Sequence, residues 1–211
     1  TTEIYTLSLH DALPIFPRGF GDCGLKDDGD LYGVFLPHNY LAWYADQVAL
    51  WAAQELGESA VELEQLVTRA RGDLLAAMEW GAIREADSAW LPGVPGKTSG
   101  SRWGALYALT PCRLLADDHP LIEGSLAKFE KPLSEGGLPV DTGWLAGGLW
   151  VAMALDNFAE AHLARDEGDE LASLFYATLT HATPLVTWCE ERAPEPGATT
   201  CPGHRQHLWT P

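Results

Sequence analysis

Two kinds of hydrophobic pattern alternate along the chain. Residues Tyr40–Leu56 are apolar on nearly every side of a helical projection, which predicts a helix buried all round. Residues Ser59–Trp80 carry a single apolar stripe with charged residues off it, which predicts a surface helix. Ser59 is followed three residues later by Glu62, a spacing typical of a capped helix start. Together these segments predict a hairpin of one inner and one outer helix.

The same alternation occurs twice more. Ser101–Leu109 and Gly148–Leu163 have the apolar pattern, while Pro120–Phe129 and Asp169–His181 have the amphipathic one. The period is weak, at about 45–50 residues. The sequence therefore predicts an all-α fold made of about three αα-hairpins.

The connections differ in length according to which kind of helix they follow. Those from an inner to an outer helix are short: Gly57–Glu58, Ala116–His119 and Arg165–Gly168. Those leading back to an inner helix are long and rich in Gly, Pro and Trp: Gly19–Asn39, Gly81–Gly100, Lys131–Gly147 and Thr183–Gln206. In a closed ring of hairpins, all the long connections emerge at one end and line a cavity, where loops commonly carry function. We therefore predict part of a helical toroid, with a helical-repeat solenoid or another helical bundle as the alternatives.

Both ends of the chain have a bearing on the domain boundaries. Thr1–Ile15 matches the translation of a widely used sequencing-library adapter at every position, so we exclude it from the fold and give His10 and Asp11 no catalytic role. The native domain is expected to occupy residues 16–211 and to continue beyond both ends, as a fragment from an assembled metagenomic read. Half a ring would leave its inner helices uncovered, so we expect the chain alone to be prone to aggregate and inactive.

Composition excludes several classes of partner and cofactor. A net charge of −17 disfavours binding to the phosphate backbone of nucleic acids. No apolar run approaches the roughly 20 residues needed to cross a bilayer. Cys23, Cys112, Cys189 and Cys201 lack C-x-x-C spacing, which argues against a structural zinc site, and we expect no metal or other cofactor. Interpreted as buried free thiols, these cysteines favour a reducing, cytoplasmic compartment.

Carboxylates are concentrated in the first and fourth long loops. Asp28 and Asp30 lie among glycines in the first loop, and Glu190 and Glu191 follow Trp188 in the fourth. Hydrolysis of a glycosidic bond requires one protonated carboxyl group for the leaving oxygen and one ionised group that activates water or attacks carbon. Crowded acids raise one another's pKa, which keeps one of them protonated. These four residues are the candidate catalytic groups. The alternatives are turn-forming or capping aspartates and a solvated acidic patch.

The same loops supply side chains that suit a sugar ligand. Sugar rings stack on indole faces, and their hydroxyl groups pair with carboxylates and guanidinium groups. Trp103 and Trp150 lie inside predicted helices, so we assign them to the core instead. The candidate substrate-binding residues are Asp22, Asp27, Tyr32, Trp90, Lys97, Arg102, Asp141, Trp144, Trp188, Arg205, His207 and Trp209.

Two further motifs are too incomplete to predict a site. Gly93–Thr98 contains part of a phosphate-binding loop pattern, but Leu91 stands where the first glycine is required and no strand is predicted before it. His204 and His207 are three residues apart and have no acidic ligand in register, so they do not predict a metal site.

Three short segments resemble the six-hairpin glycosidases, the (α/α)6 toroid superfamily that includes trehalases, processing α-glucosidases, debranching glucosidases and α-rhamnosidases. Asp22–Asp28 is similar to the loop that presents the general-acid aspartate in the processing glucosidases, although Lys26 stands at the position of that aspartate. Thr187–Glu191 resembles the segment that bears the base glutamate in rhamnosidase-like members. Gly203–Pro211 resembles a stretch that opens an inner helix.

This resemblance implies an incomplete (α/α)6 toroid and an inverting hydrolase that acts on an oligosaccharide or another glycoside. Asp28 or Asp30 would be the acid, and Glu190 or Glu191 the base. Because fold analogy alone does not establish a reaction, two other classes stay open. One is a sugar-binding or sugar-epimerising protein on the same scaffold, with His38, His204 and His207 as the histidines near the loops. The other is a helical scaffold that binds protein.

Overall fold

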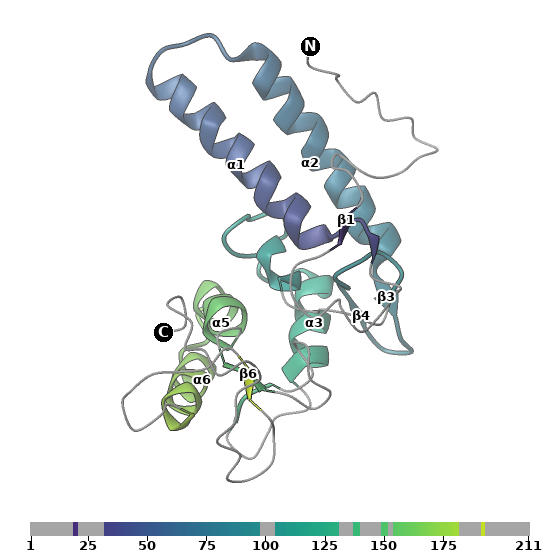
Figure 1. Ribbon diagram of the computed structural model, residues 1–211, viewed down its shortest axis with the longest axis vertical. Helices are drawn as coiled ribbons and strands as arrows, with labels where there is room; N and C mark the ends of the chain where they lie inside the picture. Colours follow the sequence, from purple (N-terminus) through teal and green to yellow (C-terminus); the bar gives the residue numbers. More distant parts are fainter. Residues whose placement is uncertain are drawn as a thin grey trace.

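The computed structural model is mostly helical in the part of the chain that it describes, which confirms the predicted all-α class (Figure 1). It describes the side chains of residues 34–97, 104–130, 137–139, 151 and 157–181, and the backbone alone of residues 19–20, 32–33, 149–150, 154–156 and 191–192. The elements run in the order β1 (Gly19–Phe20), β2 (Tyr32–Gly33), α1 (Leu36–Glu55), α2 (Val61–Gly81), β3 (Ile83–Arg84), β4 (Ala89–Trp90), η1 (Ala105–Ala108), α3 (Pro120–Glu130), β5 (Leu149–Trp150), η2 (Ala154–Ala159), α5 (Glu160–Ala164), α6 (Gly168–Thr180) and β6 (Glu191–Arg192).

Helices α1 and α2 form the hairpin that the sequence predicts (Figure 1). The indole N–H of Trp43 in α1 donates a hydrogen bond to the carbonyl of Val67 in α2, at 3.0 Å. Helix α1 begins earlier than predicted because Pro37 fits the first helical turn, where its missing N–H costs nothing. Helix α2 begins after Ala60 and no side chain caps it, so the predicted cap at Ser59 is wrong.

Helix α1 is buried on one side only. Its buried residues include Leu36, Tyr40, Trp43 and Leu50, whereas Trp51 is 59% exposed. The prediction that this helix is covered all round is therefore wrong for the described structure. Apolar residues occupy nearly the whole circumference of the helix, but its partners among the described residues cover about half of it.

The second apolar segment does not form the expected inner helix in its described part. Only Ala105–Ala108 is helical, as the single 3₁₀ turn η1. Gly104 precedes it with a φ of 76°, a conformation that favours glycine, and Pro111 follows it without the N–H donor that would extend a helix. The outer helix α3 was predicted correctly and ends one residue later than expected, at Glu130.

The third apolar segment is also broken. Leu149 and Trp150 form the strand β5, so the prediction that Trp150 lies inside a helix is wrong. The π-helical turn η2 follows, and α5 then continues to Ala164. Helix α6 begins at Gly168 and ends at Thr180, within one residue of the predicted outer helix at each end.

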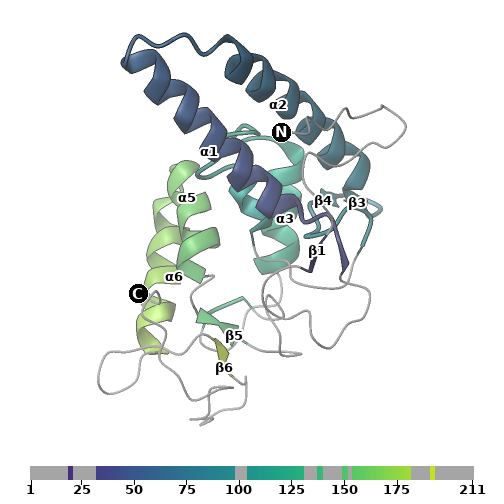
Figure 2. The same cartoon turned by 45° about the horizontal axis from the view of Figure 1, so that its top comes forward.

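The elements pack in the order in which the sequence alternates them. Helix α1 contacts η1, and η1 contacts η2. Each of the three also packs on the amphipathic helix of its own pair: α1 on α2, η1 on α3, and η2 on α6. One buried cluster extends from Leu36 in α1 through Trp90 and Ile122 to Leu174 in α6, and both views show α5 and α6 side by side (Figures 1 and 2). None of the helices within the described ranges is both long and apolar enough to span a bilayer.

Candidate functional site

Most of the predicted site residues lie outside the described part of the chain. Of the candidate catalytic groups, only Glu191 is placed, and only its backbone. Tyr32 is likewise placed through its backbone in β2. Trp90 and Lys97 are described in full. The remaining predictions fall on residues whose structure is not described: Asp22, Asp27, Asp28, Asp30, Arg102, Asp141, Trp144, Trp188, Glu190, Arg205, His207 and Trp209.

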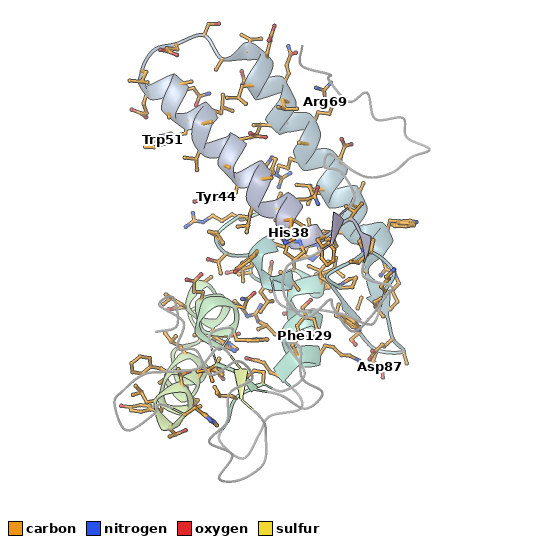
Figure 3. The ribbon with its side chains drawn as sticks, in the orientation of Figure 1. His38, Tyr44, Trp51, Arg69, Asp87 and Phe129 are labelled. Atoms are coloured by element: carbon orange, nitrogen blue, oxygen red, sulfur yellow. The ribbon has the colours of Figure 1, made fainter. Side chains whose placement is uncertain are left out.

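The first and second long loops meet beside the start of α1. The backbone N–H of Leu36 donates to the carbonyl of Gly93 at 2.9 Å, and the side chains of Phe35 and Val94 form a small buried cluster. His38 is exposed in the first turn of α1, with its ring centroid 5.3 Å from that of Phe35 (Figure 3). The described parts of these two loops therefore lie at one end of the α1–α2 hairpin, as the alternating helices predict.

The fourth long loop is joined to the start of the third apolar segment by a pair of antiparallel strands. In this ladder, Leu149 pairs with Arg192 and Trp150 pairs with Glu191. The backbone of one candidate catalytic residue therefore lies directly opposite Trp150, which the sequence had assigned to the core of a helix.

Trp90 is a core residue in this structure. Its side chain is 2% exposed, and its ring meets Phe129 of α3 edge to face with centroids 5.5 Å apart. Its indole N–H donates to the Glu85 carboxylate at 3.1 Å, while the Lys128 ammonium lies 5.3 Å from the ring centroid. Burial therefore favours a packing role for Trp90 over the predicted contact with a sugar. Lys97, half-buried, ends a turn in which its N–H donates to the carbonyl of Val94.

A buried histidine joins the last two outer helices. His162 of α5 contacts a carboxylate at each ring nitrogen: Nδ1 lies 2.7 Å from Glu167, and Nε2 lies 2.7 Å from Glu130 at the end of α3. Arg165 donates from Nε to the second oxygen of Glu167 at 2.9 Å, and it also bonds the carbonyl of Asp117. The cluster therefore links α3, α5 and the start of α6.

The two carboxylates favour the charged form of the imidazole. Burial lowers the pKa of His162, but the hydrogen bonds and negative charges of Glu130 and Glu167 outweigh burial and raise the pKa above its ordinary 6.5. For Glu167, burial raises the pKa, but the hydrogen bonds from His162 and Arg165 and their charges lower it below its ordinary 4.5. An imidazolium that donates from both nitrogens satisfies both carboxylates at once.

This arrangement suits a structural joint rather than a proton shuttle. Both ring nitrogens of His162 are occupied, so neither can take a proton from a substrate. The two carboxylates lie at different ring nitrogens, and no set of three His, Cys, Asp or Glu side chains suited to a metal ion occurs among the described residues. The sequence analysis missed this cluster. The available signal was a histidine inside an apolar helix, with Arg165 and Glu167 three and five residues later.

A second buried polar group lies in the core near the start of α1. The Tyr40 hydroxyl has no hydrogen-bond partner among the described residues. Burial and the nearby Cys112 thiol raise the pKa of Tyr40 well above its usual 10.0. Burial raises the pKa of Cys112 to about 12, so this free thiol stays protonated and is no nucleophile at neutral pH.

Removing the Tyr40 hydroxyl is expected to leave stability unchanged or to increase it. Burying a hydroxyl without a partner costs about 1–3 kcal/mol, so Tyr40→Phe removes a cost and keeps the packed ring. The control is Trp43→Phe, which removes the bond to Val67 and is expected to destabilise by about 1–2 kcal/mol. Urea denaturation of both variants measures the difference. A Tyr40→Phe variant as destabilised as Trp43→Phe would show that the hydroxyl has a partner.

Comparison with known proteins gives no relative. No family model, no curated protein and no solved structure matches the chain.

Proposed function

We propose that this chain is part of an inverting glycoside hydrolase, built as an arc of an (α/α)6 toroid. Asp28 or Asp30 would protonate the leaving oxygen, and Glu190 or Glu191 would activate the attacking water. The substrate class is an oligosaccharide or another glycoside, and the chemistry requires no cofactor. The remaining hairpins of the ring would close the cavity around the sugar.

The packing order supports the ring. Successive apolar elements contact one another, α1 with η1 and η1 with η2, and each packs on its own amphipathic helix. A stack of hairpins in which one member of each pair faces inward has this contact pattern. A solenoid has the same local pattern, so closure of the ring is part of the proposal.

The observation that carries the proposal is the backbone bonding of the long loops to one another and to the third apolar segment. The first loop is bonded to the second where Leu36 meets Gly93, and the fourth is bonded to the start of the third apolar segment where Trp150 pairs with Glu191. Loops held together on a rigid helical scaffold form the usual setting of a binding site. The pairing places the backbone of a candidate base beside an aromatic residue.

Binding of a charged sugar mimic tests the proposal. Polyhydroxylated piperidines carry the positive charge of the oxocarbenium-like transition state, and a hydrolase binds such mimics more tightly than the neutral sugar. We expect the complete ring, with its remaining hairpins, to bind at least one piperidine of a stereochemical panel about 100-fold more tightly than the parent sugar, measured by titration calorimetry. Glu190→Gln or Glu191→Gln is expected to weaken this binding by tenfold or more.

The matched control is Glu170→Gln, which neutralises an exposed glutamate in the first turn of α6 and should leave binding unchanged. Equal binding of the piperidine and the neutral sugar would indicate a sugar-binding protein instead of a hydrolase. No binding across the panel, or binding that is indifferent to both glutamate variants, would refute the acid–base assignment.

A further inference from the structure

The two carboxylates that contact His162 are not held equally firmly. Glu167 is fixed near the ring by its own backbone, because its N–H donates to the carbonyl of His162 at 2.9 Å. Its carboxylate also accepts a hydrogen bond from Nε of Arg165. Glu167 directly precedes α6, where the partly positive helix N-terminus favours a negative charge. These interactions, none of which involves the imidazole, keep Glu167 in place.

Glu130 depends on the imidazole alone. Nε2 of His162, at 2.7 Å, is the partner of its carboxylate, which has no other among the residues that the structure describes. Glu130 is the last residue of α3, where the unpaired carbonyl groups of the helix end disfavour a negative charge. Its side chain is 22% exposed, so the carboxylate can turn to water.

Loss of the ring proton would set these two carboxylates in competition. A charged imidazole donates from both nitrogens, whereas a neutral one donates from one nitrogen and carries a lone pair on the other. That lone pair would face a carboxylate oxygen at 2.7 Å, in a site where the His162 side chain is 6% exposed. One carboxylate must then move away. Because Glu167 is held by its other interactions, Glu130 is the one that moves.

We propose that His162 is a pH-dependent switch at the end of α3. The charged ring holds Glu130 and Glu167 together. When the ring gives up one proton to water, Nδ1–H stays bonded to Glu167, and Glu130 is released into solvent. The last turn of α3 then loses its bond to α5, while the link between α5 and α6 is kept.

The charges around the ring set the direction of the switch. Glu130 from α3 and Glu167 at the start of α6 act on His162 directly, and Arg165 acts on it through Glu167. Both carboxylates raise the pKa of His162, so Glu130 is released above pH 6.5. Asp156 of η2 is described through its backbone alone. The other titratable residues from α5 to the end of α6 are exposed: Glu160, Asp166, Asp169, Glu170 and Tyr176.

The release is confined to the end of α3. Phe129, the residue before Glu130, packs edge to face on Trp90 at 5.5 Å and on Phe158 of η2 at 6.5 Å (Figure 3). These apolar contacts do not depend on the ring proton, so α3 and η2 stay together.

The third long loop begins directly after Glu130. It packs on α6 at Gly137, where a Cβ atom would lie 3.3 Å from that of Ala177. The switch therefore acts where this loop leaves α3. An effect on a sugar cavity rests on the proposed function, whereas the switch itself does not.

Nitrogen NMR of the imidazole rings in the whole chain, recorded from pH 6 to pH 10, tests the proposal. The signals of His162 are those that disappear in His162→Gln. We expect both nitrogens to be protonated at pH 6, and Nδ1 alone to keep its proton at the upper end of the range. The Nε2–H tautomer would mean that Glu167 is released instead. That result, or a ring that keeps both protons throughout, overturns the proposal.

Amide hydrogen exchange shows whether the end of α3 loosens at the same time. Protection of the amides of residues 127–130, relative to an unstructured peptide at the same pH, is expected to fall about tenfold or more between pH 6 and pH 9. The amides of residues 78–81, in the last turn of α2, should change by less than about twofold. Equal changes in the two helix ends would overturn the proposal.

Glu130→Gln and Glu123→Gln form a matched pair of variants on α3. A carboxamide can accept from a ring N–H or donate to a ring lone pair, so Gln at position 130 stays bonded in both states of His162. We expect its protection to be independent of pH within about twofold. Glu123 is exposed, so Glu123→Gln should keep the pH dependence of the original chain. A Glu130→Gln variant that loosens as the original does would refute the switch. No sugar enters these measurements, so their failure is distinct from failure of the proposed function.

Discussion

Replacing Gly124 with alanine is expected to lower the melting temperature by roughly 6–12 °C, corresponding to about 3 kcal/mol of lost stability. A Cβ atom at this position would overlap the carbonyl oxygen of Ala89 in β4 and would lie 2.9 Å from its carbonyl carbon. Because both neighbouring groups are backbone, no side-chain rotation relieves the overlap. Helix α3 would have to move away from the β3–β4 hairpin.

The contacts that surround Gly124 would be lost with that movement. Ser125 accepts a hydrogen bond from the backbone N–H of Leu91 at 2.9 Å, and it donates to the carbonyl of Leu121 at 2.6 Å. The edge-to-face contact between Trp90 of β4 and Phe129 of α3 joins the same two elements. Separating helix from hairpin would leave buried polar groups unpaired, which adds to the steric cost.

Gly72→Ala is the matched control, since Gly72 is also a helical glycine but a Cβ there would have nothing within 4 Å. Alanine is the better helix former by about 1 kcal/mol, so this variant is expected to be slightly more stable than the original. Calorimetric melting of both variants gives the comparison. A Gly124→Ala protein that melts within a degree of the original would show that α3 and β4 do not approach as closely as described.

The amphipathic helices could be predicted from the sequence because a one-sided stripe has a single packing solution. Val67, Leu74 and Met78 of α2 are all buried, and the start and end of α6 fall within a residue of the prediction. A stripe fixes which side of a helix meets the core. Charges and turn residues at its ends then fix the length.

The apolar segments could not be predicted as well, because an apolar run does not distinguish a helix from a buried turn or strand. In the second segment, Gly104 adopts a positive φ and Pro111 removes a donor, so that only η1 remains helical in its described part. In the third, Leu149 and Trp150 are drawn into a ladder with residues 191–192, some 40 positions further along the chain. Tertiary pairing, absent from any local window, decides the outcome in the third segment.

Only the part of the candidate site that follows from the order of the helices along the chain could be predicted. The meeting of the first two long loops beside α1 follows from the alternation of helices. The cluster around His162 does not, because Glu130 is 32 residues away in sequence and reaches the ring only once α3 and α5 are in place. Trp90 was assigned to a binding loop because its segment is rich in glycine and proline, but the fold buries it against α3.

Replacing His162 with glutamine is expected to destabilise the chain by about 2–3 kcal/mol at pH 5.5 and by less at pH 9. The side chain of His162 is 6% exposed, and those of Glu130 and Glu167 are 22% and 31% exposed. Glutamine has one amide group to donate, so it cannot reach both carboxylates and brings no positive charge. One partly buried carboxylate would lose its partner.

The pH dependence follows from the directions of the two pKa shifts. The pKa of His162 is raised in the folded chain, so its stabilising contribution is complete below the ordinary 6.5 and is lost as the pH rises through the folded value. The pKa of Glu167 is lowered, so its contribution is complete above the ordinary 4.5 and is lost as the pH falls through the folded value. Both contributions are complete only between these limits. The gap in the free energy of unfolding between the original chain and His162→Gln should therefore be largest at about pH 4.5–6.5.

Urea denaturation at pH 5.5, 7 and 9 measures this gap, and Glu79→Gln serves as the comparison. Glu79 pairs with Arg84 on an exposed surface, where an ion pair contributes less than about 1 kcal/mol, so its loss should be small and nearly constant over this range. A gap for His162→Gln that is independent of pH would mean that the imidazole is neutral in the fold. In that case one carboxylate would itself have to hold a proton, and Glu130→Gln or Glu167→Gln would be nearly without effect. A gap that shrinks as the pH rises instead identifies the charged imidazole as the link between α3, α5 and α6.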